Sequence, residues 1–353
     1  MWKIDEKKLQ NILDEATSSG EECGCQLAIF KDGEQILSLA SGYTGPDRTT
    51  PVTTDSLFPI YSCGKGIMAT TVHMLKEKGI LDYNERIAHY WPAFGKNGKE
   101  DIRLWQIMSH RTGLHNLPDL PDFALQGDWE YMCRAMEEAV PAVKVGTKCC
   151  YQGTTHAWLV GETIRQATGR SMREIILDEI VRPLNLEGNL IFGTTPEEDA
   201  RCVQVDNTAQ KNSWCHKYIN TPRIRHGFMP SANGIATATA LAKHYSAVVC
   251  ETDGVKLLKD ETLAEATKLC RDPNDTPLES TWARFGLGYA LPGNMDTLHY
   301  WFGHGGALGA EGFGDRKNKM AYAFVKNKDL VSHPIHPVRA RLSEALELPN
   351  RIW

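Results

Sequence analysis

The chain has 353 residues, of which 42% are hydrophobic and 24% charged, a composition typical of a globular protein. Its formal net charge is −5, and it contains no basic run of the kind that binds nucleic acid. No stretch approaches the roughly 18 apolar residues that span a bilayer, and the charged N-terminus, MWKIDEKKLQNILDEA, lacks the apolar centre of a signal peptide. We therefore expect a cytoplasmic protein with a small-molecule substrate and neither a nucleic-acid nor a membrane partner, whereas the oligomeric state stays open.

The first elements along the chain are a helix and a β-hairpin. Apolar residues at helical spacing from Leu9 to Ala16 predict an amphipathic helix that ends at Gly20. The runs QLAIF and QILSLASG flank an Asp-Gly turn and predict two antiparallel strands. A further helix is expected over about 64–79.

The middle of the chain, roughly 100–250, shows mainly helix and loop signals. One helical stripe runs from Ala157 to Ile164, and Ser171 with Glu174 forms a capping box before the next helix. The chain then returns to strands, with a last helix from about Pro337 to Glu347; the strand-like runs are ARFGLGYAL, YWFGHGGALG and MAYAFVKN. This order predicts an α/β (α+β) fold with one central antiparallel sheet that is built from both termini, flanked by helices and interrupted by a mostly helical insertion.

Ten cysteines are more than a chain of this length usually carries. Without a secretory signal we expect free thiols and not a disulfide framework. The Cys-x-Cys pair and the isolated Cys215-His216 lack the paired spacing of a zinc site. The sequence therefore predicts no metal and no other cofactor.

Ser62 and Lys65 carry the first chemical signal. A serine at a helix start with a lysine three residues later places both side chains on one helix face, and the helix N-terminus favours a developing oxyanion. The lysine can accept the serine proton only if desolvation or nearby cations lower its pKa. Gly64 and Gly66 each cost the helix up to about 1 kcal/mol, so we expect them to admit substrate or another strand. Alone the pattern is weak, because this spacing arises about once by chance in such a chain.

Two further segments strengthen the case. Tyr151 precedes the helical stripe; a phenol beside an ammonium is drawn toward phenolate and can act as a partner base, although a tyrosine there more often packs. The run His304-Gly305-Gly306-Ala307 opens a Gly-rich strand. Its glycines can let substrate lie along the strand edge, and one of its backbone N–H groups can complete an oxyanion hole.

Together these segments resemble the serine β-lactamase-like hydrolases, the family of class C β-lactamases, DD-peptidases and family VIII carboxylesterases. The similarity covers nearly the whole chain, in order: FPIYSCGKGIMATTVHMLKEKGI, DIRLWQIMSHRTGL, CCYQGTTHAWLVGETIRQATG, PSANGIATATALAKHYSAV and FGHGGALGAEGFGDRKNKMAYAFVKN. It implies one β-lactamase/transpeptidase-like catalytic unit over 1–353. Its α/β part is expected at about 1–95 and 270–353, and its helical part at about 96–269.

The resemblance also implies roles for individual residues. Ser62 is expected to be the nucleophile, Lys65 its activating partner, and Tyr151 a residue that helps to shuttle the proton. His304 stands where class C enzymes have the lysine of Lys-Thr-Gly. The backbone N–H groups of Ser62 and Ala307 are expected to form the oxyanion hole.

Departures from the family pattern narrow the expected substrate. The Tyr-x-Asn motif is here Tyr151-Gln152-Gly153, and Lys-Thr-Gly is His304-Gly305-Gly306. A histidine of ordinary pKa near 6.5 is mostly neutral at pH 7, so this site is expected to grip a carboxylate weakly. Both changes, with the run WLVGE after the tyrosine, favour the esterase branch.

We therefore expect a serine hydrolase that forms an acyl-enzyme on Ser62 and acts as a carboxylesterase on small esters. A β-lactamase, a D-aminoacyl peptidase and an acyltransferase of the same fold remain alternatives, with a lactam as the second substrate class. A non-catalytic binding module is disfavoured because Ser62, Lys65 and Tyr151 are all intact.

Two other features have structural expectations. Several tryptophans could line an acyl pocket but are expected mainly in the core; they are Trp105, Trp129, Trp158, Trp282 and Trp301. Ser109-His110 is expected to pack and not to catalyse.

Overall fold

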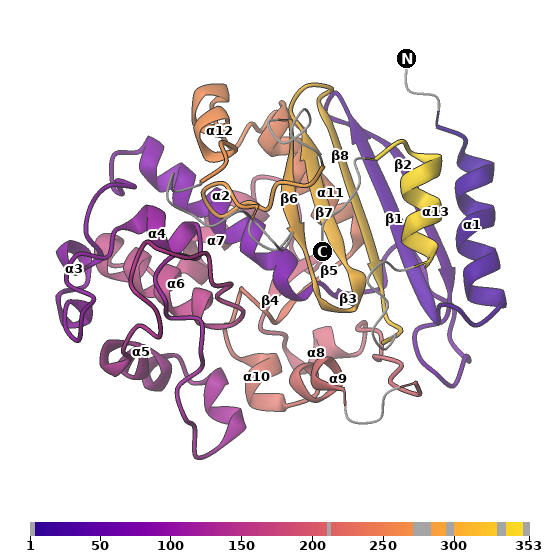
Figure 1. The fold of residues 1–353 in the computed structure, drawn as a ribbon. Helices are drawn as coiled ribbons and strands as arrows, with labels where there is room; N and C mark the ends of the chain where they lie inside the picture. Colours follow the sequence, from indigo (N-terminus) through magenta and orange to yellow (C-terminus); the bar gives the residue numbers. More distant parts are fainter. Residues whose placement is uncertain (1–3, 210–212, 271–283, 294–299, 330–336, 349–353) are drawn as a thin grey trace.

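One antiparallel sheet combines strands from both ends of the chain (Figure 1). Its strands, in the order β2-β1-β8-β7-β6, are β2 (Glu34–Gly42), β1 (Gly24–Lys31), β8 (Met320–Lys326), β7 (Glu311–Asp315) and β6 (Trp301–Gly305). The computed structural model describes residues 4–209, 213–270, 284–293, 300–329 and 337–348. The two chain ends meet where β1 pairs with β8, from Cys25 opposite Lys326 to Lys31 opposite Met320. The predicted α/β (α+β) fold with a sheet built from both termini is thus confirmed.

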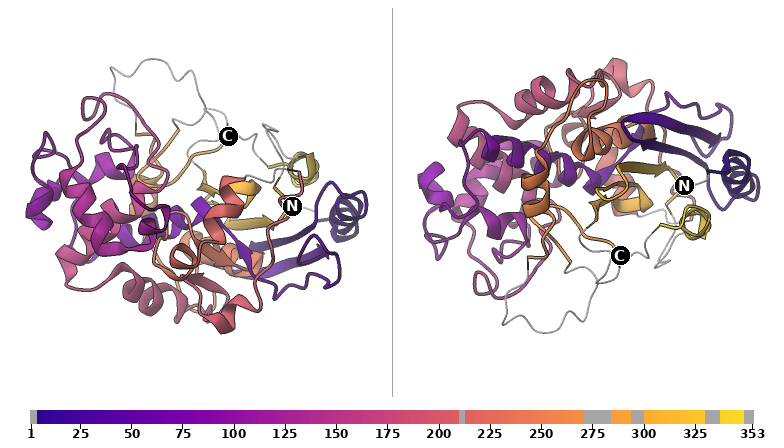
Figure 2. Two further views of the ribbon diagram at one scale, coloured as in Figure 1. Left: turned by 90° about the horizontal axis from the view of Figure 1, so that it is seen from below. Right: turned by 90° about the horizontal axis from the view of Figure 1, so that it is seen from above.

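Two terminal helices lie side by side on one face of this sheet (Figures 1 and 2). α1 (Glu6–Ser18) begins after Asp5, whose carboxylate accepts the Lys8 N–H, and it ends before Gly20, as predicted. α13 (Pro337–Ala345) ends slightly before its predicted limit. Their apolar faces and the sheet bury a common cluster that includes Leu13, Phe324 and Leu342.

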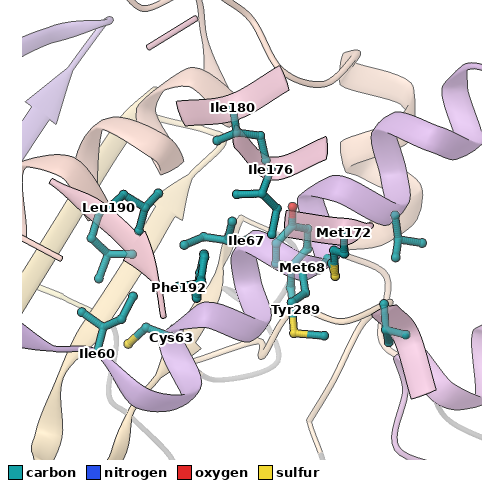
Figure 3. Close-up of a cluster of buried hydrophobic side chains, with 14 of the residues drawn as sticks. Ile60, Cys63, Ile67, Met68, Met172, Ile176, Ile180, Leu190, Phe192 and Tyr289 are labelled. Carbon is teal, nitrogen blue, oxygen red and sulfur yellow. The ribbon is translucent and has the colours of Figure 1, made fainter. Parts of the chain in front are cut away.

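The opposite face carries α11 (Ala238–Val249), which packs against β1, β7 and β8 although it belongs to the predicted helical part. α2 (Gly64–Glu77) lies between this layer and the helices of residues 104–176 (Figure 1). Ile67 and Met68 of α2 pack into a large core with Ile176 and Phe192 (Figure 3). Because α2 is buried almost all round, the residues at its N-terminus are held firmly.

The middle of the chain is mainly helical, as predicted. Besides α11 it contains α4 (Leu104–Met108), α5 (Trp129–Glu138), α6 (Thr155–Thr168), α7 (Met172–Ile176), α8 (Pro196–Asp199), α9 (Trp214–Ile219) and α10 (Pro222–His226); α3 (Ile87–Tyr90) precedes it and α12 (Asp260–Ala266) follows it. The capping box of Ser171 and Glu174 begins α7, as expected. A second sheet, which the sequence patterns did not indicate, has the order β3-β5-β4, with β3 (Phe58–Pro59), β5 (Gly234–Ala236) and β4 (Leu190–Phe192).

One strand prediction is wrong. The run ARFGLGYAL, described from Arg284 onward, forms a turn in which Phe285 and Ala290 make an isolated bridge. The Gly286 N–H bonds to Tyr289 O, and Gly288 adopts a φ of 83°. This left-handed glycine reverses the chain, so the alternating apolar residues do not extend into a strand.

Candidate active site

Ser62 lies in a 3₁₀ turn, Tyr61–Cys63, that leads into α2. The preceding Tyr61 has a φ of 44°, a conformation that is uncommon for a bulky side chain. Tyr61 is buried, and its hydroxyl donates to Cys215 O at 3.0 Å. Surrounding structure therefore maintains a strained backbone beside Ser62, as is common at functional sites.

The two glycines after Ser62 serve close packing. A Cβ at Gly64 would lie 1.9 Å from Pro230 O, and a Cβ at Gly66 would lie 1.9 Å from Tyr245 Oη. The groups that approach here belong to the protein itself. The close approach expected at these glycines is therefore present, but the groups that approach are a loop carbonyl and a tyrosine hydroxyl and not substrate or a strand backbone.

Lys65 is fully buried, and its amine lies 3.0 Å from Ser62 Oγ. Lys65 Nζ also donates to Gly153 O at 2.6 Å and to Ser231 O at 2.8 Å. Burial lowers the pKa of Lys65 well below its usual value. A neutral amine has two N–H groups, which the two carbonyls can accept, and its lone pair is then left for the Ser62 O–H.

Tyr151 completes the group around Ser62. Its phenol is hydrogen-bonded to Ser62, and its ring centroid lies 5.0 Å from Lys65 Nζ. Burial raises the pKa of Tyr151, and the hydrogen bond with Ser62 lowers it by less. The expectation that a neighbouring ammonium draws Tyr151 toward phenolate is therefore wrong, because desolvation dominates and the phenol keeps its proton.

His304 stands on β6 and is buried. Its Nδ1 lies 2.6 Å from Gly305 O and therefore carries a proton, because a carbonyl can only accept. Burial, and then the nearby Lys65, lowers the pKa of His304 to about 3. The imidazole is thus neutral at pH 7, as the sequence suggested.

These residues converge on one cavity of about 530 Å³, which is lined by Ser62, Tyr151, His304, Gly305, Gly306 and Ala307. Gly306 allows the end of β6 to lie against the Ser62 turn, because a Cβ there would fall 2.2 Å from Ile60 O. With Lys65 bonded to Ser62, the structure brings together all seven residues that the sequence singled out.

The residues that form the apolar walls of the cavity are not the tryptophans considered from the sequence. Leu117, Trp214 and Phe285 line it, and Leu117 and Trp214 keep 38% and 45% of their surface exposed. Of the tryptophans considered from sequence, Trp158 is fully buried and Trp282 lies outside the described residues. No Lys or Arg occurs among the described residues that line the cavity.

Sequence reasoning also missed the carbonyls that hold Lys65. They belong to Gly153 and Ser231, which lie 88 and 166 residues further along the chain. No sequence pattern marks them, because any residue supplies a backbone carbonyl. All ten cysteines are free thiols.

Two further observations concern the described part of the chain. No group of three or more His, Cys, Asp or Glu side chains there is arranged to hold a metal ion. No described helix combines the length and the apolar character needed to cross a membrane.

Comparison with known proteins places the chain in a family. The model of the Beta-lactamase family matches residues 9–344. The esterase/β-lactamase LipL of Mycobacterium tuberculosis is 30% identical over 335 residues, which cover 86% of this chain and 77% of LipL.

Solved structures agree over almost the full length. A family VIII carboxylesterase superposes with a TM-score of 0.85 at 25% identity and covers 98% of both chains. A penicillin-binding protein homologue from Caulobacter crescentus gives a TM-score of 0.84 at 27% identity, covering 98% of this chain and 97% of its own. The chain therefore belongs to the β-lactamase family, and it is a serine hydrolase with the β-lactamase/transpeptidase fold.

Proposed function

We propose that this protein is a carboxylesterase that cleaves small uncharged esters through an acyl-enzyme on Ser62. The observation that carries the proposal is the chemistry of the cavity around Ser62. Its walls include Leu117, Trp214 and Phe285, and its described lining residues offer no Lys or Arg to bind a substrate carboxylate. The histidine in the position of the family's lysine is neutral, because burial lowers its pKa to about 3.

The first half of the reaction follows from the contacts of Ser62. Lys65, 3.0 Å away, accepts the hydroxyl proton as Ser62 Oγ bonds to the ester carbonyl carbon. The backbone N–H groups of Ser62 and Ala307 stabilise the resulting oxyanion. When the carbon–oxygen bond breaks, Tyr151 passes its phenolic proton to the leaving alkoxide and regains one from Lys65, so an alcohol departs and the acyl group stays on Ser62.

The second half returns the free enzyme. A water molecule takes the place of the alcohol, Tyr151 and Lys65 together accept its proton, and its oxygen attacks the acyl carbon. Collapse of this intermediate releases the carboxylic acid, and Ser62 Oγ regains its proton. The second half is thus the reverse of the first, with water in place of the alcohol. The same two residues, Lys65 and Tyr151, transfer the protons in both halves, as microscopic reversibility requires.

A β-lactam is the second candidate substrate, since the name of LipL joins esterase and β-lactamase. Acylation of Ser62 by a lactam uses the same steps, with an amine in place of the alkoxide. An acyltransferase differs only in that an alcohol or amine replaces the water.

A panel of p-nitrophenyl esters from acetate to dodecanoate, beside nitrocefin and a D-Ala-D-Ala peptide, tests the proposed substrate. We expect turnover of the short esters, slow hydrolysis of nitrocefin and no measurable cleavage of the peptide. Cleavage of the peptide faster than every ester would overturn the carboxylesterase assignment.

A further inference from the structure

His110 follows Ser109, the residue that caps the C-terminal end of α4, and bonds to both neighbours of Tyr151. The Cys150 N–H donates to the His110 backbone carbonyl at 2.8 Å. The Gln152 N–H donates to His110 Nδ1 at 3.2 Å. One residue thus accepts the backbone N–H groups of both residues that flank Tyr151 in the chain.

The following residues extend this attachment. The Thr112 hydroxyl donates to Gln152 Oε1 at 3.2 Å. The Thr155 hydroxyl donates to Leu114 O at 2.7 Å. Hydrogen bonds therefore hold the chain from Cys150 to Thr155 against the segment 110–114.

The ring of His110 also packs directly against the site. Its centroid lies 4.8 Å from that of Tyr151, 4.5 Å from that of Phe285 and 4.9 Å from that of His156. His110 is 1% exposed and has a φ of 60°, a conformation for which Asn, Asp and His are the best suited residues after Gly. A histidine therefore suits the positive φ at position 110.

The His110 ring is neutral and can therefore accept a hydrogen bond at Nδ1. Burial lowers its pKa well below the usual value, and the nearby His156, Lys65 and His304 lower it further. In the neutral ring Nδ1 accepts the Gln152 N–H, so the proton lies on Nε2. A protonated ring would lose this acceptor.

We propose that His110 is a positioning residue that holds the Tyr151 phenol in reach of Ser62, through the two hydrogen bonds that flank Tyr151. This inference rests on the proposed function, because it assumes that Tyr151 relays protons to and from Ser62. It goes beyond the expectation from the sequence that His110 packs and does not catalyse, because a positioning residue need not touch the substrate. A displacement of about 1 Å of a catalytic group can cost on the order of 100-fold in rate.

Three substitutions separate positioning from packing. His110→Phe keeps the ring contacts and removes the Nδ1 acceptor, whereas His110→Asn places a carboxamide oxygen near the Nδ1 position and tolerates the positive φ. For hydrolysis of p-nitrophenyl butyrate we expect kcat to fall about 10- to 100-fold in His110→Phe, with KM changed less than about threefold. His110→Asn is expected to retain kcat within about threefold. Ser109→Ala is the control, because the Ser109 hydroxyl donates to Trp105 O in its own helix, and we expect its kcat to be unchanged.

A double-mutant cycle with Tyr151→Phe gives the decisive readout. If His110 acts through Tyr151, His110→Phe should change the remaining rate less than about twofold in the Tyr151→Phe background. The inference would be overturned if the rate losses of His110→Phe and Tyr151→Phe multiplied in the double variant. Equal loss in His110→Phe and His110→Asn, or full activity of His110→Phe, would also overturn it. If His110→Phe does not fold, His110→Gln replaces it as the partner of His110→Asn, because its longer amide overshoots the Nδ1 position. Equal rates of these two amide variants would then refute the inference.

A Ser62→Ala control keeps the two proposals apart. If Ser62→Ala loses turnover but the His110 variants do not show the expected rates, only the positioning role is refuted. Undiminished turnover in Ser62→Ala defeats the proposed function itself.

Discussion

Replacement of Lys65 by methionine removes the proposed base while keeping the length and much of the volume of the side chain. Lys65 Nζ has three partners: Ser62 Oγ at 3.0 Å, Gly153 O at 2.6 Å and Ser231 O at 2.8 Å. Methionine cannot accept the Ser62 proton, and general-base catalysis contributes about 10²- to 10⁴-fold. We therefore expect kcat/KM for p-nitrophenyl butyrate to fall about 10³-fold, or about 4 kcal/mol of transition-state stabilisation.

The effect on stability should be smaller than the effect on rate. Two buried carbonyls lose their donor, at about 1–3 kcal/mol each. This loss is partly offset, because burying the Lys65 amine opposes folding and methionine has no amine to desolvate. Unfolding in urea, followed by circular dichroism, measures this change beside the esterase assay.

Lys99 provides a matched control. It too is fully buried, and its amine donates to two carbonyls, Glu137 O at 2.9 Å and Ala139 O at 2.6 Å. Lys99→Met should therefore lose similar stability while it retains kcat/KM within about twofold, since the amine of Lys99 bonds to Glu137 O and Ala139 O and not to Ser62. A Lys65→Met protein that hydrolyses the ester within tenfold of the parent would refute the assignment of Lys65 as the base.

Further predictions concern pH, the cavity and the buried charges. Because burial lowers the pKa of Lys65 and the neutral amine is the active form, kcat/KM should rise with pH through that lowered pKa and level off well below pH 10.5; a rise that continues to pH 10.5 would contradict a desolvated base. Trp214→Ala should lower kcat/KM for octanoate esters about fivefold and leave acetate unchanged, because it removes about 1 kcal/mol of apolar contact at a partly exposed position; equal loss for both esters would exclude an acyl-chain contact. Lys326→Met removes the ammonium that lies 3.0 Å from the buried Glu22 carboxylate and should lower the free energy of unfolding by about 3–5 kcal/mol in urea titrations, with kcat of the folded protein retained; an unchanged urea midpoint would contradict it.

Sequence patterns identified the parts of the site that depend on local spacing. Ser62 and Lys65 share one helix face because they lie three residues apart, and this holds whatever packs around the helix. The sheet from both termini could be inferred from short apolar runs bounded by turn residues, with β1 and β8, which are buried along almost their whole length, as clear cases. The turn at Gly288 could not, because its alternation is that of a strand and only tertiary contacts, such as its bond to Met108 O, reveal the reversal.

The surroundings of Ser62 depend on contacts between distant segments. Trp214 and Phe285 line the cavity without any periodic pattern to indicate it. His110 reaches the Tyr151 segment through two hydrogen bonds that span about 40 residues of chain. The pKa of Tyr151 was misjudged for the same reason, since its desolvation comes from the folded structure and not from its neighbours in sequence.

The central claim is that an acyl-enzyme forms on Ser62, and covalent labelling tests it most directly. The parent and Ser62→Ala proteins are treated with a fluorophosphonate probe, and the modified peptide is located by mass spectrometry, with p-nitrophenyl butyrate turnover followed in parallel. We predict that the parent carries one label, on the peptide that contains Ser62, and that Ser62→Ala loses both the label and the turnover. Equal labelling or equal turnover of the two proteins would contradict the account.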